Sequence, residues 1–215
     1  MIKVAFATGM NGEFGLNGGL PWNRMFKVDM DSFMEFTDKC MLVMGVKTFQ
    51  SLPKKLRGLR HIVISTHTGS DLIRCKNGDT PDSIARATDV RQFLRGLSET
   101  YDICVIGGKS LIEEALPIAD KVLHTVVFKK FKHDDVEDLL GMQCDVSISP
   151  MHVQYSQVHI ESGGNYSFKY HDYPHKSASN ISYGVCVHEF DAITEISNNY
   201  YNKQELTHKL NADNM

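Results

Sequence analysis

The 215-residue sequence has no long apolar run, little net charge and no paired cysteine motif. No apolar stretch approaches the roughly 18 residues that cross a membrane. The apolar residues 1–7 run directly into Gly9, Asn11 and Gly12, so we expect neither a membrane partner nor a signal peptide. The net charge of −3 provides no basic surface for nucleic acid. An anionic ligand therefore needs a local cluster of basic residues.

Cysteine and histidine are arranged in ways that argue against disulfides and metal sites. The five cysteines are odd in number and widely scattered, so neither a disulfide framework nor a thiolate metal site is indicated, and a reducing cytoplasm fits best. His171 and His175 are four apart, but Pro174 lies between them. Because proline disfavours a helix there, the spacing does not put both rings on one face, and we expect a surface loop without a metal.

Strand-like and helical segments alternate along most of the chain. This alternation predicts an α/β fold with a mostly parallel sheet. The run 103–106 is apolar throughout, which is typical of a central strand buried on both faces. Helical stripes lie within 90–97 and 111–116, and Pro117 stops the second. The strand-like runs cover residues 2–8, 41–44, 61–65, 103–106 and 122–128.

The pattern changes near the C-terminus. Residues 151–173 alternate polar and apolar side chains around a Gly-Gly-Asn turn at 163–165, which predicts an antiparallel hairpin at the edge of the sheet. Beyond Pro174 the sequence becomes rich in Asn and Ser. We therefore divide the chain into a main domain over 1–174 and a C-terminal extension over 175–215 of unassigned role.

One predicted strand ends in a pair of glycines. The strand 103–106 runs into Gly107 and Gly108, and a helix is predicted to begin with Lys109 and Ser110. Glycine at this point lets a phosphate approach the backbone, where exposed N–H groups and the helix dipole hold it. The alternative interpretation is a plain tight turn between strand and helix.

Two further strands end in groups that suit a phosphate. Gly45 follows the strand 41–44, with Lys47 and Thr48 in the first turn of the next helix, although routine capping by Thr48 also explains this pattern. The strand 61–65 ends in Ser65 and Thr66. Ligands of open α/β sheets bind outside the carboxyl ends of the strands. The three strand ends together therefore predict a phosphate-binding edge.

The single tryptophan, Trp22, ends a long glycine-rich loop of the kind that often closes over a site. A helix is predicted over 25–38, and within it Asp29 and Phe33 lie four apart on one face. If Asp29 is buried on this aromatic stripe, it needs a hydrogen-bonding or cationic partner. The alternative is that Asp29 begins the solvent face. Asp31 lies about 200° further round the helix, and we predict that it is exposed.

Together these blocks resemble the dihydrofolate reductase family. The first block is Phe14-Gly15, Leu20-Pro21-Trp22, Asp29 and Phe33, an order and spacing typical of that family. The second and third are Met44-Gly45-x-Lys47-Thr48-Phe49-x-Ser51-Leu52 and Val105-Ile106-Gly107-Gly108, followed by Leu116-Pro117 and by Thr125 in the next strand. The resemblance covers about 1–173. It implies a mostly parallel sheet of about eight strands flanked by helices, and a catalytic domain over 1–174.

The resemblance also implies an activity, the reduction of 7,8-dihydrofolate to tetrahydrofolate with NADPH in support of one-carbon and thymidylate metabolism. Asp29 would bind the pterin amidine edge by a paired, charge-assisted contact and assist protonation of N5. Trp22 and Thr125 would position Asp29 and a water. The cofactor delivers hydride to C6, while the protein supplies orientation, water exclusion and a proton route. Antifolate-type molecules are implied as further ligands, and no metal is implied.

The implied binding residues fall into two sets. The substrate set lines a pocket for the pterin and aminobenzoyl groups and comprises Ala5, Met30, Phe33, Leu52, Leu56, Arg57, Arg60 and Ile106. In the cofactor set, Ala7, Phe14 and Thr48 would contact the nicotinamide end, and Lys47, Ser65, Gly107 and Gly108 the phosphates. The remaining cofactor residues are Leu20, Gly45, Thr66, Lys109 and Ser110.

The sequence departs from the family pattern at three places. The loop before Asp29 is one or two residues longer than usual, so the spacing to Phe33 selects the acid. The arginine that binds the folate glutamate is displaced, and either Arg60 shifts register or Arg57 substitutes. A one-residue shift in a strand turns the side chain to the other face. Val46 stands where the family often has a basic residue, which leaves the neighbouring lysine to meet the phosphates.

Two other functions compete with this interpretation. A pyrimidine reductase of riboflavin synthesis shares the fold and NADPH but lacks the pattern of Pro21, Trp22 and Asp29. A non-catalytic binding or structural protein is the second alternative. In that case the extension 175–215 could dock a protein partner, although a tail that is flexible or packs on its own domain is the simpler interpretation. Its apolar residues are Tyr200, Tyr201, Leu206 and Leu210.

Overall fold

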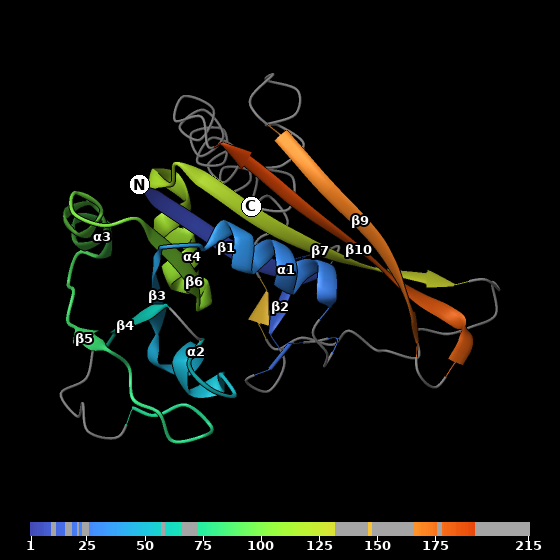
Figure 1. The fold of residues 1–215 in the computed structure, drawn as a ribbon, viewed down its shortest axis with the longest axis horizontal. Helices are drawn as coiled ribbons and strands as arrows, with labels where there is room; N and C mark the ends of the chain where they lie inside the picture. The colour runs from blue at the N-terminus through green and yellow to red at the C-terminus, as the bar shows by residue number, and fades with distance from the viewer. Residues whose placement is uncertain are drawn as a thin grey trace, which may run out of the picture.

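The computed structural model contains an eight-stranded sheet, which is shown in Figure 1. Its strands are β1 (Ile2–Gly9), β3 (Met41–Gly45), β4 (Arg60–Ile64), β5 (Ser83–Ala85), β6 (Ile103–Gly107), β7 (Lys121–Phe131), β9 (Tyr166–His175) and β10 (Ala178–Asp191). Two short strands, β2 (Glu13–Gly15) and β8 (Val146–Ser147), form a separate antiparallel pair. The structure describes residues 1–9, 12–15, 19–20, 22, 26–56, 59–65, 73–131, 146–147, 166–175 and 178–191.

The strand order is β5-β4-β3-β6-β1-β7-β10-β9. The first six strands of this order pair in parallel, and β10 runs antiparallel to both β7 and β9. The predicted α/β class, the mostly parallel sheet and the count of about eight strands are confirmed. The helices are α1 (Lys27–Phe36), α2 (Val46–Ser51), α3 (Val90–Ser98) and α4 (Lys109–Ala115), the last continued by the 3-10 turn η2 (Leu116–Ile118).

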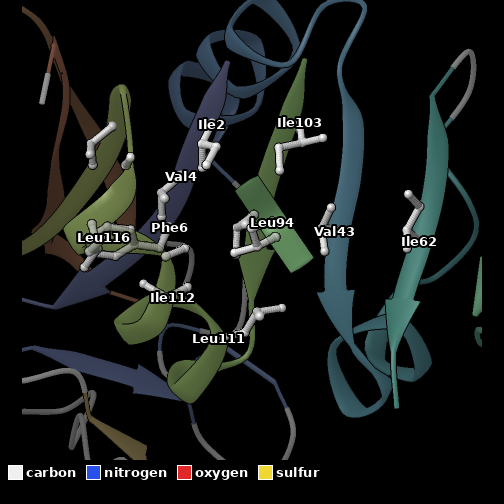
Figure 2. Close-up of a cluster of buried hydrophobic side chains, with 14 residues drawn as sticks. Ile2, Val4, Phe6, Val43, Ile62, Leu94, Ile103, Leu111, Ile112 and Leu116 are labelled. Atoms are coloured by element: carbon white, nitrogen blue, oxygen red, sulfur yellow. The ribbon is translucent and has the colours of Figure 1, made fainter. Parts of the chain in front are cut away.

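Strand β1 shows how the sheet is buried on both faces. Successive strand residues point to opposite faces, so Val4 and Phe6 join the cluster under α3 and α4, whereas Ala5 joins the cluster under α1 and α2. Figure 2 shows the first cluster, with Leu94 of α3 and Ile112 of α4 packed on the strands. We call these two surfaces of the sheet the α3/α4 face and the α1/α2 face.

The helix predicted from the 90–97 stripe is confirmed as α3. Asp89 precedes it, and its carboxylate accepts the Gln92 N–H at 2.9 Å, which satisfies one of the free N–H groups at the helix start. Leu94 is completely buried on the α3/α4 face. Pro117 lies in η2, where it ends the helix as predicted.

The predicted antiparallel hairpin at the C-terminal end of the sheet is confirmed, but its two strands are β9 and β10 and lie further along the chain than expected. The strand expected around residues 166–170 is confirmed within β9, but β9 pairs with β10. The other predicted arm of the hairpin falls in 151–165, outside the described residues. Strand β10 lies between β7 and β9, so the sheet extends beyond the boundary predicted at 174. Residues 192–215 of the predicted extension lie outside the described residues.

The reason that β10 escapes sequence analysis is visible in its burial. Val185, Cys186 and Val187 are consecutive and all buried, so they show no alternation of polar and apolar side chains. The segment 178–184 that precedes them contains Ser179, Asn180, Ser182 and Gly184, which give it the composition of a loop. Strand β10 is consequently specified by pairing with β7 and β9 rather than by its own pattern.

Membrane and metal features can be assessed within the described part of the chain. No helix there is long and apolar enough to cross a membrane. No group of three or more His, Cys, Asp or Glu side chains there is arranged to hold a metal ion. His171 and His175 lie on β9 rather than in the expected loop. The four described cysteines are not paired.

A charge placed within β10 tests whether this strand belongs to the folded domain. Val185 is completely buried between β7 and β9, so Val185→Asp should lower the free energy of unfolding by about 3 kcal/mol or more. Urea unfolding followed by circular dichroism measures the loss. Lys169→Ala, on the exposed edge strand β9, serves as the control and should change stability by less than about 1 kcal/mol. Wild-type stability of Val185→Asp would contradict the assignment.

Candidate active site

The centre of the site is Asp29, in the first turn of α1. Thr125 of β7 donates a hydrogen bond from Oγ1 to Asp29 Oδ1 at 2.5 Å, joining residues that are 96 apart in the sequence. Figure 1 shows α1 lying along the face of the sheet, and its last residue, Phe36, packs in one cluster with Ala5 of β1. The hydrogen bond thus lies between this helix and the strands beneath it.

The environment of Asp29 differs sharply from that of Asp31. Burial raises the pKa of the Asp29 carboxyl, and the hydrogen bond from Thr125 opposes part of this rise. Asp31 is exposed and forms an ion pair with Lys27 on the outside of α1. The alternative in which Asp29 begins the solvent face is therefore excluded, and the predicted exposure of Asp31 is confirmed.

Trp22 is buried close to this helix. It is 5% exposed and forms a small cluster with Phe26, Val127 and Val185, against which Ala7 and Val28 also pack. Val28 directly precedes Asp29. The structure therefore places Trp22 beside the start of α1, while Pro21 lies outside the described residues.

An apolar wall extends from Asp29 along the α1/α2 face. Most of the predicted substrate residues belong to the hydrophobic cluster of this face, and the apolar wall is made of them. Met30 is half-buried next to Asp29 on α1. Leu59, directly before β4, also packs in this cluster, and the sequence prediction missed it. It lies four residues before Val63, so alternation along the extended chain puts both side chains on one face, and this spacing was the available signal. The predicted members that pack together are Ala5, Phe33, Leu52, Leu56 and Ile106.

Arg60 does not join this wall. It is exposed at the start of β4, and the residues that alternate with it in phase, Ile62 and Ile64, pack on the α3/α4 face. Leu59 and Val63 occupy the opposite face. The prediction of Arg60 as a substrate residue is corrected accordingly, because the side chain falls on the wrong face of the strand. The alternative, Arg57, lies outside the described residues.

The carboxyl edge of the sheet brings the glycine blocks together. Met44 of β3 pairs with Gly107 of β6. A methyl group added at Gly107 would lie 3.0 Å from Thr48 Oγ1, and one added at Gly45 would lie 3.7 Å from the Gly108 nitrogen. Gly107 has a φ of 141°, which favours glycine, and the Gly107–Gly108 peptide bond is cis. The predicted convergence of these two strand ends is confirmed.

The other predicted cofactor residues are less uniformly placed. Lys47, Lys109 and Ser110 are exposed in the first turns of α2 and α4, and Lys109 lies 3.9 Å from the Glu113 carboxylate on the same helix. Ser65 is buried just after β4, and its N–H donates to the Ala85 carbonyl at 3.0 Å.

One residue predicted at the nicotinamide end, Phe14, packs in a different cluster from Ala7. Phe14 packs against the cluster of the α3/α4 face, whereas Ala7 packs beside Trp22. Leu20 is 38% exposed. Thr66 lies outside the described residues. The edge therefore combines glycine backbone, one threonine hydroxyl and exposed lysines, a set suited to phosphate groups.

Comparison with known proteins decides the family. A model of the family "Dihydrofolate reductase" matches residues 1–139, well over half of the chain. The chain belongs to the dihydrofolate reductase family. All of the predicted site residues lie within the matched span, whereas β9 and β10 lie beyond it.

Individual members of the dihydrofolate reductase family agree with this assignment. The dihydrofolate reductase of Bacillus subtilis (strain 168) is 28% identical over 134 residues, 62% of this chain and 73% of that protein. Dihydrofolate reductase type A10 of Escherichia coli is 35% identical over 140 residues, 63% of this chain and 71% of that protein.

A solved structure extends the comparison of the fold. Dihydrofolate reductase from Enterococcus faecalis, complexed with NADP(H) and RAB-propyl, matches with a TM-score of 0.54 and 18% identity. The match covers 89% of this chain and 95% of that one. At this identity the likeness concerns the fold alone, and the high coverage extends it beyond the span of the family model.

The burial of Asp29 makes a prediction about stability. Asp29→Asn should raise the free energy of unfolding at neutral pH, because the amide removes a buried charge and still accepts the Thr125 hydrogen bond. A carboxyl whose pKa is raised by folding contributes its full stability below the ordinary value of 3.8 and loses it as the pH rises through the folded-state value. The advantage of the variant should therefore shrink as the pH falls toward 3.8.

Chemical unfolding at neutral and acid pH measures this difference. Asp31→Asn is the matched control, because its carboxylate is exposed on the same helix and should give a small change with no comparable pH dependence. A variant Asp29→Asn that is less stable than wild type at neutral pH would show that the carboxylate is stabilised by partners other than Thr125.

Proposed function

We propose that the protein catalyses the NADPH-dependent reduction of 7,8-dihydrofolate to tetrahydrofolate, a reaction that supports one-carbon and thymidylate metabolism. The observation that carries the proposal is the half-buried Asp29 carboxylate, held by Thr125 next to an apolar wall. A buried acid next to apolar side chains can bind a flat heterocycle that presents N–H donors at one edge. Family membership supports the same reaction.

On the substrate side, Asp29 would accept paired N–H bonds from the pterin amidine edge, using the carboxylate oxygens that Thr125 leaves available. Phe33 and Ile106 would pack on the pterin, and Leu52 and Leu56 on the aminobenzoyl group, as members of the apolar wall. Antifolate-type molecules with the same amidine edge are proposed as further ligands of this wall.

On the cofactor side, the carboxyl edge fits a dinucleotide. A Cβ on Gly107 would crowd Thr48, so the glycine backbone leaves room for a phosphate next to the Thr48 hydroxyl. Lys47 and Lys109 add positive charge from two helix starts. Ala7 would lie against the nicotinamide. When bound, NADPH supplies the hydride that reduces C6 of the substrate.

Asp29, Thr125 and Trp22 would together contribute to the delivery of a proton to N5 of the substrate. Burial raises the pKa of Asp29, which brings its proton affinity closer to that needed for transfer near neutral pH. Thr125 fixes one oxygen, and the buried indole of Trp22 excludes bulk water from the start of α1. We propose that Asp29 assists proton delivery to N5 through a water positioned by this group.

The alternative functions have less support. A pyrimidine reductase of riboflavin synthesis would not require the buried pair of Asp29 and Thr125, and the family model that matches is that of dihydrofolate reductase. A purely structural or partner-docking protein has no need for a buried carboxylate that costs stability.

Steady-state kinetics test the proposed reaction and its acid. Purified protein should oxidise NADPH when dihydrofolate is present and not when it is absent. Asp29→Asn should lose activity at neutral pH by roughly a hundredfold or more, because it removes the acid near N5. Asp31→Asn should retain activity, because Asp31 is exposed and paired with Lys27. Cofactor binding without turnover would favour the structural alternative, and equal loss in both variants would contradict the role of Asp29.

The proposed phosphate contact of Lys47 can be measured separately. Lys47→Ala should raise the KM for NADPH about tenfold with little change in kcat, since a charge-assisted contact to phosphate is lost. Lys54→Ala, an exposed lysine beyond α2, is the control and should leave the KM unchanged. Comparison of NADPH with NADH in both variants shows whether Lys47 contributes to the preference between them. An unchanged KM in Lys47→Ala would remove this residue from the cofactor site.

A further inference from the structure

A buried histidine forms a hydrogen bond with the backbone of one residue of the apolar wall. His61 lies on β4 and is completely buried. Its ring packs edge-on against Phe49, with 6.0 Å between the ring centroids. Its Nε2 accepts the backbone N–H of Leu56 at 3.1 Å. The strand thus hydrogen-bonds, through a side chain, to the irregular segment that precedes it.

Leu56 is part of a segment that has no regular partner for its backbone. Residues 52–56 follow α2 and belong to neither a helix nor a strand. Buried N–H groups of such a segment require acceptors from elsewhere. The Leu52 carbonyl accepts the Lys76 N–H at 3.0 Å, and His61 supplies the acceptor for Leu56. The side chains of Leu52 and Leu56 both pack in the apolar wall.

Asp82 holds the strand side of the same arrangement. One of its oxygens accepts the His61 backbone N–H at 2.7 Å, and the other accepts from Lys55 Nζ at 2.6 Å. The Asp82 N–H in turn donates to the His61 carbonyl at 3.0 Å. Lys55 and Leu56 are consequently both linked to His61 of β4, Lys55 through Asp82 and Leu56 by a direct hydrogen bond.

The protonation state of the ring suits this role. Burial lowers the pKa of His61, with the charge of Lys55 acting in the same direction and Asp82 opposing both. The ring is therefore neutral at neutral pH. Because Nε2 accepts from Leu56, the proton of the neutral ring lies on Nδ1. Within the described residues Nδ1 has no hydrogen-bond partner, and an Asp82 oxygen lies 3.6 Å from it.

We propose that His61 is a positioning residue for substrate specificity. It fixes the part of the apolar wall formed by Leu52 and Leu56 in the conformation that receives the aminobenzoyl part of the substrate. This inference rests on the proposed function for its ligand, but the contact of His61 with Leu56 stands independently of it. Loss of the acceptor leaves the N–H of the half-buried Leu56 without this partner, and the wall then occupies its binding conformation for a smaller fraction of the time. Substrate affinity falls by the same factor, while the chemical step at Asp29 is unaffected.

Two variants separate the acceptor from the bulk of the ring. His61→Phe keeps an aromatic ring and removes the acceptor, whereas His61→Gln keeps an acceptor near the position of Nε2. In His61→Phe we expect the KM for dihydrofolate to rise about tenfold, with kcat and the KM for NADPH within about threefold of wild type. His61→Gln should restore the KM. Ile62→Val, the next residue of β4 but on the α3/α4 face, controls for general destabilisation of the strand and should leave the KM unchanged.

A second measurement does not depend on turnover. Hydrogen exchange of the Leu56 amide in the ligand-free protein should be about tenfold faster in His61→Phe than in wild type, and close to wild type in His61→Gln and Ile62→Val. Protection of Leu56 that does not respond to His61→Phe would overturn the contact. Fast exchange with an unchanged KM for dihydrofolate would overturn its role in substrate binding. If the wild-type protein neither binds nor turns over dihydrofolate, the proposed function fails, while the exchange data still decide the contact.

Discussion

The hydrogen bond from Thr125 to Asp29 is the interaction on which the site depends. A carboxylate in the apolar space between a helix and a sheet is costly unless a donor reaches it, and Thr125 provides one at 2.5 Å. The same bond fixes α1 against β7, so the helix that carries the acid and the strand that carries the hydroxyl are placed together. Burial raises the pKa of Asp29 despite the opposing effect of this hydrogen bond, and a raised pKa suits the proposed proton transfer near neutral pH.

The rest of the proposed site is arranged around this bond by the two-sided burial of the sheet. The α1/α2 face supplies the apolar wall, and the carboxyl edge of β3 and β6 supplies the glycine backbone and Thr48. His61 then connects strand β4 to the Leu52–Leu56 segment, so that even the irregular part of the wall is fixed from within the sheet. Each part of the proposed site is therefore placed by its contacts with the strands of the sheet.

Local patterns explain what could be predicted. Asp29 and Phe33 are four residues apart, a spacing that predicts one face of a helix, and the structure contains this helix as α1. The 90–97 stripe likewise became α3, and the glycines that end two apolar runs do meet at the carboxyl edge. By contrast, the buried triplet of β10 and the Asn- and Ser-rich residues before it carry no such pattern, so its place in the sheet was missed.

The α/β class, the candidate acid and the position of the glycine blocks could be predicted from local patterns, because helix periodicity and glycine chemistry act over a few residues. Tertiary structure decided three things that depend on contacts between distant segments. It placed Thr125 against Asp29, turned Arg60 away from the apolar wall and inserted β10 beside β7. The face of a strand side chain follows from its register with neighbouring strands, and that register is fixed by pairing across the whole sheet.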